Sequence, residues 1–268
     1  MSSNKKYAML DTDFIFKSHI ARNKHNHVLI DFVLEFKDYE FYCHEQIVKE
    51  LNKHSITPNP IPWLKDKINN NIVYMYSDRD ILQDLTQVYG QAATDMYRTM
   101  LKISCDTFNS GFYNLYYSSL DALETNCDSE VFLQTLEKCD NNIPPKNGLG
   151  EKKTYVLIQM MQVFHNGNVY LFCSDDFQAR QSLSGLQNPV YALSILGVFF
   201  KLMKSGRPKE EMQEYYDHLS AFLVNQKEYK VLDKVGLHRI KVPMQNVLDD
   251  IYDGKFQLLR NGDLQYIK

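Results

Sequence analysis

The chain has 268 residues, of which 44% are hydrophobic and 13% aromatic, and it carries a formal net charge of −3. This length and hydrophobic content are enough to bury one large core or two modest ones. The slightly negative charge excludes a protein coated in basic surface, so any contact with nucleic acid must come from a local basic patch.

The first third of the chain predicts two strands, each followed by helix. Residues 7–10 are continuously apolar, as expected for a central strand of a parallel sheet. Helical periodicity then follows over residues 14–20 and 28–36. A second strand is expected at residues 40–43, and it leads into a helix that begins at about residue 45 and ends in a proline-rich loop.

The middle of the chain predicts mainly helix. The pattern is mostly helical over residues 63–139, and residues 141–150 are expected to form a loop because they contain two prolines and two glycines. A helix that is apolar nearly all round, and therefore buried, is expected over residues 149–164. A strand at residues 169–173 and a short helix at residues 177–183 follow it.

The last part of the chain predicts one more strand and two more helices. The strand is expected at residues 190–193, and the helices at residues 195–204 and 209–224. The final forty residues have a short, mixed and partly strand-like pattern. The alternation of strands and helices along the chain favours an α/β layered fold with a mainly parallel sheet.

The cysteines and the apolar segments predict a soluble cytoplasmic protein that does not bind membranes. The five cysteines are scattered and include no C-x-x-C pair, which is typical of buried thiols in a reducing compartment. The apolar run at residues 7–10 is too short for a signal-peptide core. The longest apolar stretch, residues 191–203, is interrupted by Ser194 and Lys201 and is too short to span a bilayer.

Acidic residues stand at the edges of four apolar segments. Asp11 follows the first expected strand, and Asp175 and Asp176 follow a later one. Glu50 lies at the border of the buried face of its helix, and Glu151 lies in the first turn of the long helix. Because parallel sheets place ligands at the carboxyl ends of their strands, these acids are expected to converge there on a hard cation.

Each acidic residue taken alone also has an ordinary structural interpretation. Asp11 and Asp13 fit a strand-end turn and a helix N-cap, and Asp175 with Asp176 fits a second N-cap. Glu151 fits the common preference for negative charge in the first turn of a helix. The joint order of the motifs, more than any one of them, indicates a metal site.

This order of motifs resembles that of the PIN-domain nucleases. The matching features are a hydrophobic strand ending in Asp, a helix with Ile-Val-Lys-Glu-Leu, Gly-Glu opening a long apolar helix, and a strand followed by Ser-Asp-Asp-Phe-Gln-Ala-Arg. The resemblance covers roughly residues 5–60 and 147–220. It implies a three-layer α/β/α sandwich and the cleavage of RNA, or of structured nucleic acid, with Mg²⁺ or Mn²⁺.

The resemblance also implies which residues hold the metal. Asp11 would be the central ligand, and Glu50, Glu151 and Asp175 or Asp176 would complete the ring. The cation would activate a water molecule and neutralise charge on the phosphate. Because clustered carboxylates repel one another, at least one of them should have a raised pKa without metal.

Further polar residues are expected to support this site or its substrate. Ser174 is expected to hydrogen-bond a ligand carboxylate, and Asp13 to stand beside the ligands. Lys152, Lys153 and Arg180 are expected to pair with backbone phosphates. The implied partner is therefore RNA or structured nucleic acid, and a protein partner or a homodimer is left open.

The chain departs from the compact members of this family in two places. Glu50 and Glu151 are 101 positions apart, whereas compact members use a much shorter connection. We therefore predict a nuclease domain over residues 1–224 with a helical insertion at about residues 66–145, followed by a C-terminal extension over residues 225–268. The insertion is expected to pack beside the cleft and to set substrate choice.

Two alternatives to a nuclease remain. Asp11-Thr-Asp13 after an apolar strand resembles the nucleophile motif of the haloacid-dehalogenase-like phosphohydrolases, but Phe14 follows where that family usually has Gly nearby. That alternative also gives no role to Glu50 or Glu151. The other alternative is a non-catalytic RNA- or protein-binding module on the same fold, and the intact acidic residues argue against it.

Overall fold

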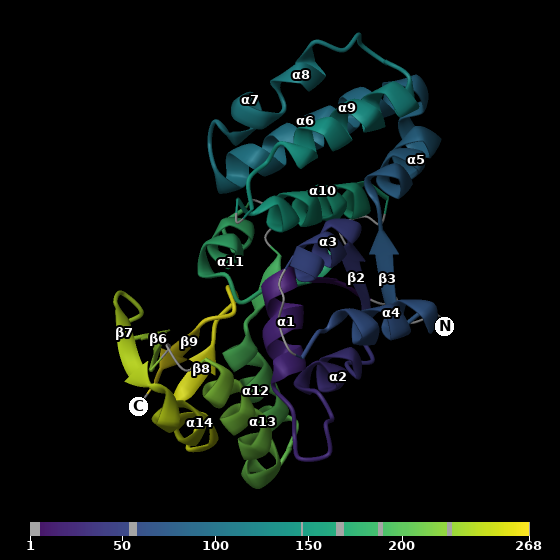
Figure 1. Ribbon diagram of the computed structural model, residues 1–268. Helices are drawn as coiled ribbons and strands as arrows, with labels where there is room; N and C mark the ends of the chain where they lie inside the picture. Colours follow the sequence, from purple (N-terminus) through teal and green to yellow (C-terminus); the bar gives the residue numbers. More distant parts are fainter. Residues whose placement is uncertain are drawn as a thin grey trace.

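A five-stranded parallel sheet stands at the centre of the fold (Figure 1). The computed structural model describes residues 6–53, 58–145, 147–164, 169–186, 190–223 and 227–267. The strands run in the order β3 (Val73–Tyr76), β2 (Tyr39–His44), β1 (Lys6–Leu10), β4 (Val169–Cys173) and β5 (Tyr191–Leu193). All four neighbouring pairs are parallel.

The central strand β1 is buried on both faces because its side chains alternate between two hydrophobic cores. Ala8 and Leu10 belong to one core, and Met9 between them belongs to the other. All three side chains are completely buried. This explains the continuous apolar run at the start of the sequence, and the predicted three-layer α/β/α sandwich is confirmed.

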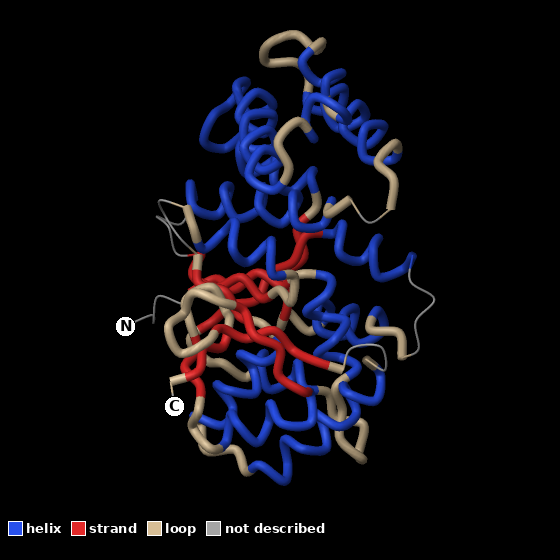
Figure 2. Tube along the Cα trace, turned by 90° about the vertical axis from the view of Figure 1, so that its left-hand side faces the viewer, coloured by secondary structure: helices blue, strands red, loops and turns tan. Residues whose placement is uncertain are grey.

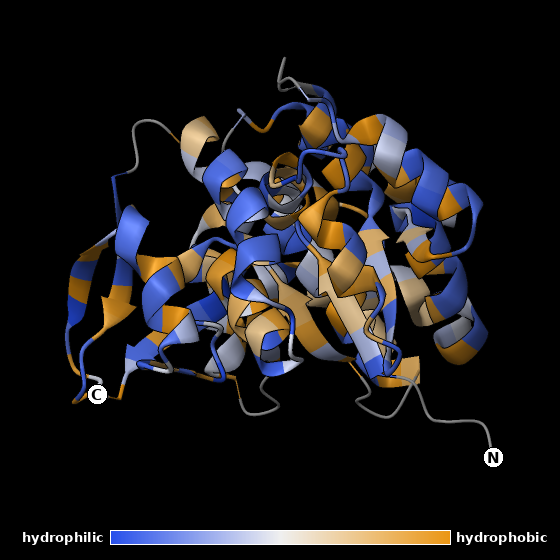
Figure 3. Ribbon diagram, turned by 90° about the horizontal axis from the view of Figure 1, so that it is seen from below, coloured by the Kyte–Doolittle hydropathy of each residue, from blue (hydrophilic) through white to orange (hydrophobic). Residues whose placement is uncertain are grey.

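Helices from both ends of the chain cover one face of the sheet. They are α1 (Thr12–Ile20), α2 (Leu29–Leu34), α3 (Glu45–Lys53), α4 (Ile61–Asn69), α12 (Ile195–Lys204) and α13 (Lys209–Phe222). Their buried residues, among them Phe14, Ile47 and Phe199, pack into the same core as Ala8 and Leu10. In Figure 3 the apolar strands lie among helices whose hydrophilic residues face outward.

The opposite face of the sheet is covered by α10 (Leu149–Phe164) and α11 (Phe177–Ser184). The middle of the chain forms a further helical layer on the far side of α10 (Figure 1). Its elements are α5 (Asp78–Tyr89), η1 (Gly90–Ala92), α6 (Ala93–Phe108), α7 (Phe112–Tyr116), α8 (Ser118–Asp121) and α9 (Ser129–Asn141). Ser104 of α6 donates a hydrogen bond of 2.6 Å to the carbonyl of Lys152, which fixes this layer to α10.

The C-terminal part of the chain forms a second, smaller sheet. Its order is β7 (Arg239–Pro243), β6 (Glu228–Leu232), β9 (Leu264–Tyr266) and β8 (Phe256–Leu258), and α14 (Met244–Tyr252) packs with it. Val231, Val247 and Phe256 join the core that contains α12 and α13. In Figure 2 the strands of the molecule lie between helices on either side. The segment predicted as an extension is therefore packed into the core.

Two predictions about the elements are wrong. The strand β3 lies inside residues 66–145, so the helical insertion begins only after it, at α5. This strand has four residues between two helices, which is too short for its alternation to stand out. The proline-rich loop also continues into α4, where Pro60 is the N-cap and Pro62 lies in the first turn. Proline is tolerated there because the backbone N–H groups at the start of a helix have no partner within the helix.

The cysteines are free thiols, as their scatter predicts. Cys43, Cys105, Cys139 and Cys173 are buried, and Cys127 is partly buried. Burial raises the pKa of the Cys43 thiol to about 12, so this side chain acts as a small apolar group in the core. Among the helices that the structure describes, none combines the length and apolar character needed to cross a lipid bilayer.

Candidate functional site

A cleft of about 540 Å³ opens beyond the carboxyl end of β1. Three elements that are distant in sequence bring carboxylates to it, namely the β1–α1 junction, α3 and the first turn of α10. The acidic residues that line it are Asp11, Asp13, Glu50 and Glu151. The sheet therefore gathers acids at the edge where parallel sheets bind their ligands.

Asp11 occupies the deepest acidic position of this cleft. Its backbone N–H continues the sheet by donating to the Cys173 carbonyl at 3.0 Å, and its side chain is only 2% exposed. Ser174 Oγ donates a hydrogen bond of 2.8 Å to Asp11 Oδ2, which is the contact expected of this serine. Burial raises the pKa of Asp11 well above its usual range, Glu151 and Glu50 raise it further, and the Ser174 hydrogen bond opposes the shift.

Glu50 connects the other two acidic segments. Its Oε2 accepts a hydrogen bond of 2.6 Å from Thr12 Oγ1, which follows Asp11 in the sequence. Its Oε1 accepts a hydrogen bond of 2.8 Å from the backbone N–H of Gly150, which precedes Glu151. The Glu50 carboxylate thus binds Thr12 and Gly150, the chain neighbours of the other two acids. This explains why Thr follows the first acid and Gly precedes the last one in the sequence.

Glu151 stands in the first turn of α10, where the helix dipole favours negative charge. Burial raises its pKa, the helix backbone opposes this by hydrogen bonding, and the nearby Glu50 adds to the increase. The raised pKa values of Asp11 and Glu151 have a shared cause, since both carboxylates are buried beside another one. The repulsion expected among the predicted ligands is therefore present.

The two aspartates after β4 have other partners. Asp175 Oδ2 accepts a hydrogen bond of 2.6 Å from Lys17 Nζ, and its Oδ1 accepts one of 3.2 Å from the Ile195 backbone. Asp176 is the N-cap of α11, since its side chain accepts from the Ala179 backbone at 2.8 Å. Among the described residues that line the acidic cleft, neither aspartate is present. Of the predicted ligands, Asp11, Glu50 and Glu151 line the cleft, and the ordinary N-cap interpretation is correct for Asp176.

Lys17 is a site residue that the sequence analysis missed. Its ammonium joins Asp13 at 2.9 Å to Asp175 at 2.6 Å. Burial opposes the charge on this lysine, but Asp175 and Asp13 outweigh burial and raise its pKa. The spacing of Asp13 and Lys17 by four positions on α1 is the sequence signal that could have revealed the pair. Asp13 is thereby held at the cleft wall.

The lysines expected to contact phosphates instead bind other groups of the protein. Lys152 donates to the carbonyls of Asn147 at 2.8 Å and Gly148 at 3.0 Å, and its Nζ lies 4.1 Å from the Phe112 ring centre. Lys153 is completely buried. Lys152 therefore fixes the loop that lines the cleft, and neither side chain is in position for a phosphate contact.

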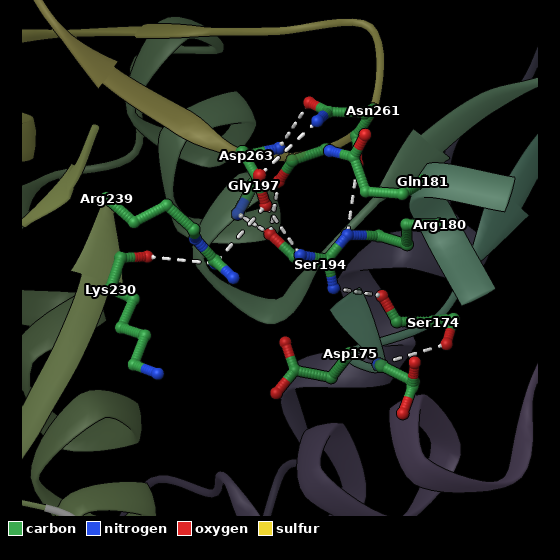
Figure 4. Close-up of polar contacts among 12 residues, drawn as sticks. Ser174, Asp175, Arg180, Gln181, Ser194, Gly197, Lys230, Arg239, Asn261 and Asp263 are labelled. Atoms are coloured by element: carbon green, nitrogen blue, oxygen red, sulfur yellow. Dashed lines mark hydrogen bonds and ion pairs between the residues drawn. The ribbon is translucent and has the colours of Figure 1, made fainter. Parts of the chain in front are cut away.

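Arg180 is likewise a structural residue (Figure 4). Its Nη2 pairs with Asp263 Oδ1 at 2.7 Å, its Nε donates to the Asn261 carbonyl at 3.0 Å, and its Nη1 donates to the Ser174 carbonyl at 3.1 Å. The side chain is 4% exposed. The predicted phosphate contact is wrong, because the guanidinium holds the C-terminal sheet against the segment that carries Ser174.

The donor chemistry of the cleft fits a hard divalent cation. The carboxylates of Asp11, Glu50 and Glu151 offer only oxygen atoms, which Mg²⁺ and Mn²⁺ prefer. Within the part of the chain that the structure describes, no three His, Cys, Asp or Glu side chains are arranged to hold a metal ion as they stand. Binding would therefore require these carboxylates to turn toward one another, and the cation would offset their repulsion.

The chain was compared with protein-family models, with curated proteins and with solved structures, and no match was found.

Proposed function

We propose that this chain is a metal-dependent nuclease that cleaves phosphodiester bonds in single-stranded RNA with Mg²⁺ or Mn²⁺. The observation that carries the proposal is the meeting of Asp11, Glu50 and Glu151 in one cleft at the carboxyl edge of a parallel sheet. The resemblance of the motif order to PIN-domain nucleases supports the same activity. We also place its action in the cytoplasm, where its free cysteines would stay reduced.

Asp11, Glu50 and Glu151 are the residues that would hold the cation. When bound, it would lower the pKa of a coordinated water and neutralise charge on the phosphate. Ser174 fixes the orientation of the Asp11 carboxylate by its hydrogen bond of 2.8 Å. Hydrogen bonds to such second partners orient a ligand carboxylate and tune its basicity.

The walls of the cleft suit an unpaired nucleotide chain. Beside the acids, the lining contains apolar side chains from three segments, including Phe16, Leu51, Pro145 and Leu149. Such surfaces can pack against sugars and bases without reading their sequence. Asp11 lies at the base of this lining, since it is almost completely buried.

The burial of Asp11 also bears on the phosphohydrolase alternative. A nucleophilic aspartate must reach the phosphorus of its substrate, but Asp11 is 2% exposed and accepts a hydrogen bond from Ser174. Its neighbours Glu50 and Glu151 also make the site more negative. The arrangement favours a metal ligand over a phosphate acceptor.

The test is cleavage of a labelled single-stranded RNA by the full chain. We expect cleavage with Mn²⁺ or Mg²⁺ that stops when EDTA is added, and we expect Asp11→Asn to abolish it. The exposed residue Asp106 provides the matched control, Asp106→Asn, which should cleave like the wild type. A phospho-aspartyl group at Asp11 would support the phosphohydrolase instead, and a folded chain without cleavage or metal binding would support the non-catalytic module.

A further inference from the structure

A second cavity, of about 600 Å³, adjoins the acidic cleft. It lies between α3, the start of α5 and the end of α9. Gln46, Ile143 and Leu149 line both hollows, so the two lie side by side with these side chains between them. A chain bound in the acidic cleft therefore has a place beside it that can take a group attached to that chain.

Gln46 stands at this junction with an unused hydrogen-bonding group. The residue is 5% exposed, and its backbone N–H donates to His44 Nδ1 at 3.1 Å. Its side-chain carboxamide forms no hydrogen bond with any residue that the structure describes, although it can both donate and accept. The side chain is thus available to a ligand that enters the junction.

Two carboxylates form the inner wall of the second cavity. Asp78 and Asp140 both line it, and their side chains are 13% and 14% exposed. The buried ammonium of Lys153 lies between them, at 2.9 Å and 2.8 Å. His44 and Tyr97 also hydrogen-bond Asp78, and Tyr117 hydrogen-bonds Asp140 at 2.6 Å. The carboxylates are therefore held in place on the wall.

These carboxylates keep acceptor capacity toward the cavity. A carboxylate has about four lone-pair sites. Asp140 accepts two hydrogen bonds, from Tyr117 and Lys153, and Asp78 accepts three. The remaining sites can accept N–H groups from a ligand.

The cations near the cavity do not make it a phosphate site. Lys49 pairs with Glu45 at 2.8 Å, and Arg79 pairs with Glu130. The other charged residues of the lining, Glu137 among them, are acidic. An anion would be repelled here, whereas a neutral ring with N–H donors would find acceptors and the apolar side chains of Leu133, Ile143 and Leu149.

We propose that the second cavity receives the nucleobase next to the phosphodiester in the acidic cleft, and that it prefers bases with an exocyclic amino group. Gln46, Asp78 and Asp140 would accept hydrogen bonds from adenine, cytosine or guanine. Uracil is disfavoured, because it has no amino group and would turn carbonyl oxygens toward the carboxylates. The inference rests on the proposed nuclease function and adds a base preference to it.

Binding of the four 5′-mononucleotides, measured without catalysis, tests this preference. We expect AMP, CMP and GMP to bind about fivefold or more tightly than UMP, the factor that one net hydrogen bond gives. In Gln46→Leu the difference should shrink, because one of the three acceptors is lost while Asp78 and Asp140 remain. Gln134 is exposed on α9, so the control Gln134→Leu should keep the wild-type preference.

A second measurement uses the wild type, so its result does not depend on whether Gln46→Leu folds. At equal, sub-saturating nucleotide concentrations, the side-chain amide signals of Gln46 in an NMR spectrum should shift more with AMP than with UMP. Equal binding of all four nucleotides, no binding, or an unchanged preference in folded Gln46→Leu would overturn the inference. RNA cleavage without base preference would overturn this inference alone, whereas the absence of cleavage and of Mn²⁺ binding would overturn the proposed function.

Discussion

The carboxylate of Glu50 accepts a hydrogen bond of 2.8 Å from the backbone N–H of Gly150, 100 positions later in the chain. This contact holds α3 against the first turn of α10, directly beside Glu151. A Cβ atom at residue 150 would lie 2.5 Å from Glu50 Oε2. Glycine at this position leaves room for the carboxylate, which an alanine would displace from the Gly150 N–H.

Gly150→Ala should destabilise the protein and weaken its binding of Mn²⁺. Alanine normally stabilises a helix relative to glycine by about 1 kcal/mol. Here the added methyl group would push Glu50 away, and such overpacking costs about 1–3 kcal/mol. Urea unfolding and Mn²⁺ titration measure the two effects. A variant that is more stable and binds Mn²⁺ as the wild type does would show that the contact is unimportant.

Asp11→Asn should raise the stability of the metal-free protein at alkaline pH. Because burial raises the pKa of Asp11 in the folded state, the folded chain holds a proton that the unfolded chain has released above about pH 4. The contribution of Asp11 to stability therefore falls as the pH rises from about 4 through the raised pKa. Asparagine does not titrate, so this loss disappears.

Thermal melting in EDTA at about pH 4 and about pH 8 measures this effect. The melting temperature of Asp11→Asn should equal or exceed that of the wild type at the higher pH, with a smaller difference at the lower pH. Asp106→Asn should show no such pH dependence because Asp106 is exposed. If Asp11→Asn is much less stable at the higher pH, Asp11 is not a repelled carboxylate.

Lys153→Met should be strongly destabilising, by about 3–5 kcal/mol, the cost of removing one partner from a buried ion pair. The change would leave Asp78 and Asp140 facing each other without their shared cation. Lys138→Met on the exposed face of α9 is the control, and it should change the free energy of unfolding by about 0.5 kcal/mol or less. If Lys153→Met and Lys138→Met lower the free energy of unfolding by the same amount, the ion pairs of Lys153 do not stabilise the protein.

The ion pairs of Lys153 join the helical layer to α10. Asp78 begins α5 and Asp140 lies near the end of α9, so removal of the whole layer would take away both partners of Lys153 and uncover the face of α10 that carries it. Point variants in the second cavity therefore test substrate choice better than a deletion does. The role of the layer in substrate choice stays a prediction.

Arg180→Met should destabilise the protein, since the buried Asp263 would keep only the more distant Arg239, whose Nη2 lies 3.9 Å away. The double variant Arg180→Met with Asp263→Leu should recover part of this loss, because the buried carboxylate is removed as well. Unfolding in urea measures both. Because Arg180 is buried, the salt dependence of RNA binding should stay unchanged. If RNA binding by Arg180→Met depends less on salt than RNA binding by the wild type, Arg180 contacts a phosphate as the sequence suggested.

The sequence predicted the inner strands of the central sheet well because they are buried on both faces. Residues 7–10 and 169–173 were found as apolar runs, and they form β1 and β4. The strand β3 was missed, since Tyr74 and Met75 are exposed and only Val73 is deeply buried. An edge strand of this kind lacks the apolar run by which a central strand is recognised.

The candidate site was predicted less completely than the fold. The positions of Asp11, Glu50 and Glu151 follow from strand ends and helix starts, which the sequence shows. The partners of Lys153 and Arg180 do not, because Lys153 pairs with Asp78, 75 positions away, in addition to Asp140, and Arg180 pairs with Asp263, 83 positions away. A basic residue beside a motif looks the same in the sequence whether it faces solvent or a buried carboxylate.

The most direct test of the central claim is an anomalous difference map from crystals of the full chain soaked in Mn²⁺. The account predicts a peak in the acidic cleft, coordinated by Asp11 together with Glu50 or Glu151. It also predicts that the peak is lost in Asp11→Asn crystals treated in the same way. No peak in the wild type, or a peak only at Asp175 or in the second cavity, would contradict it.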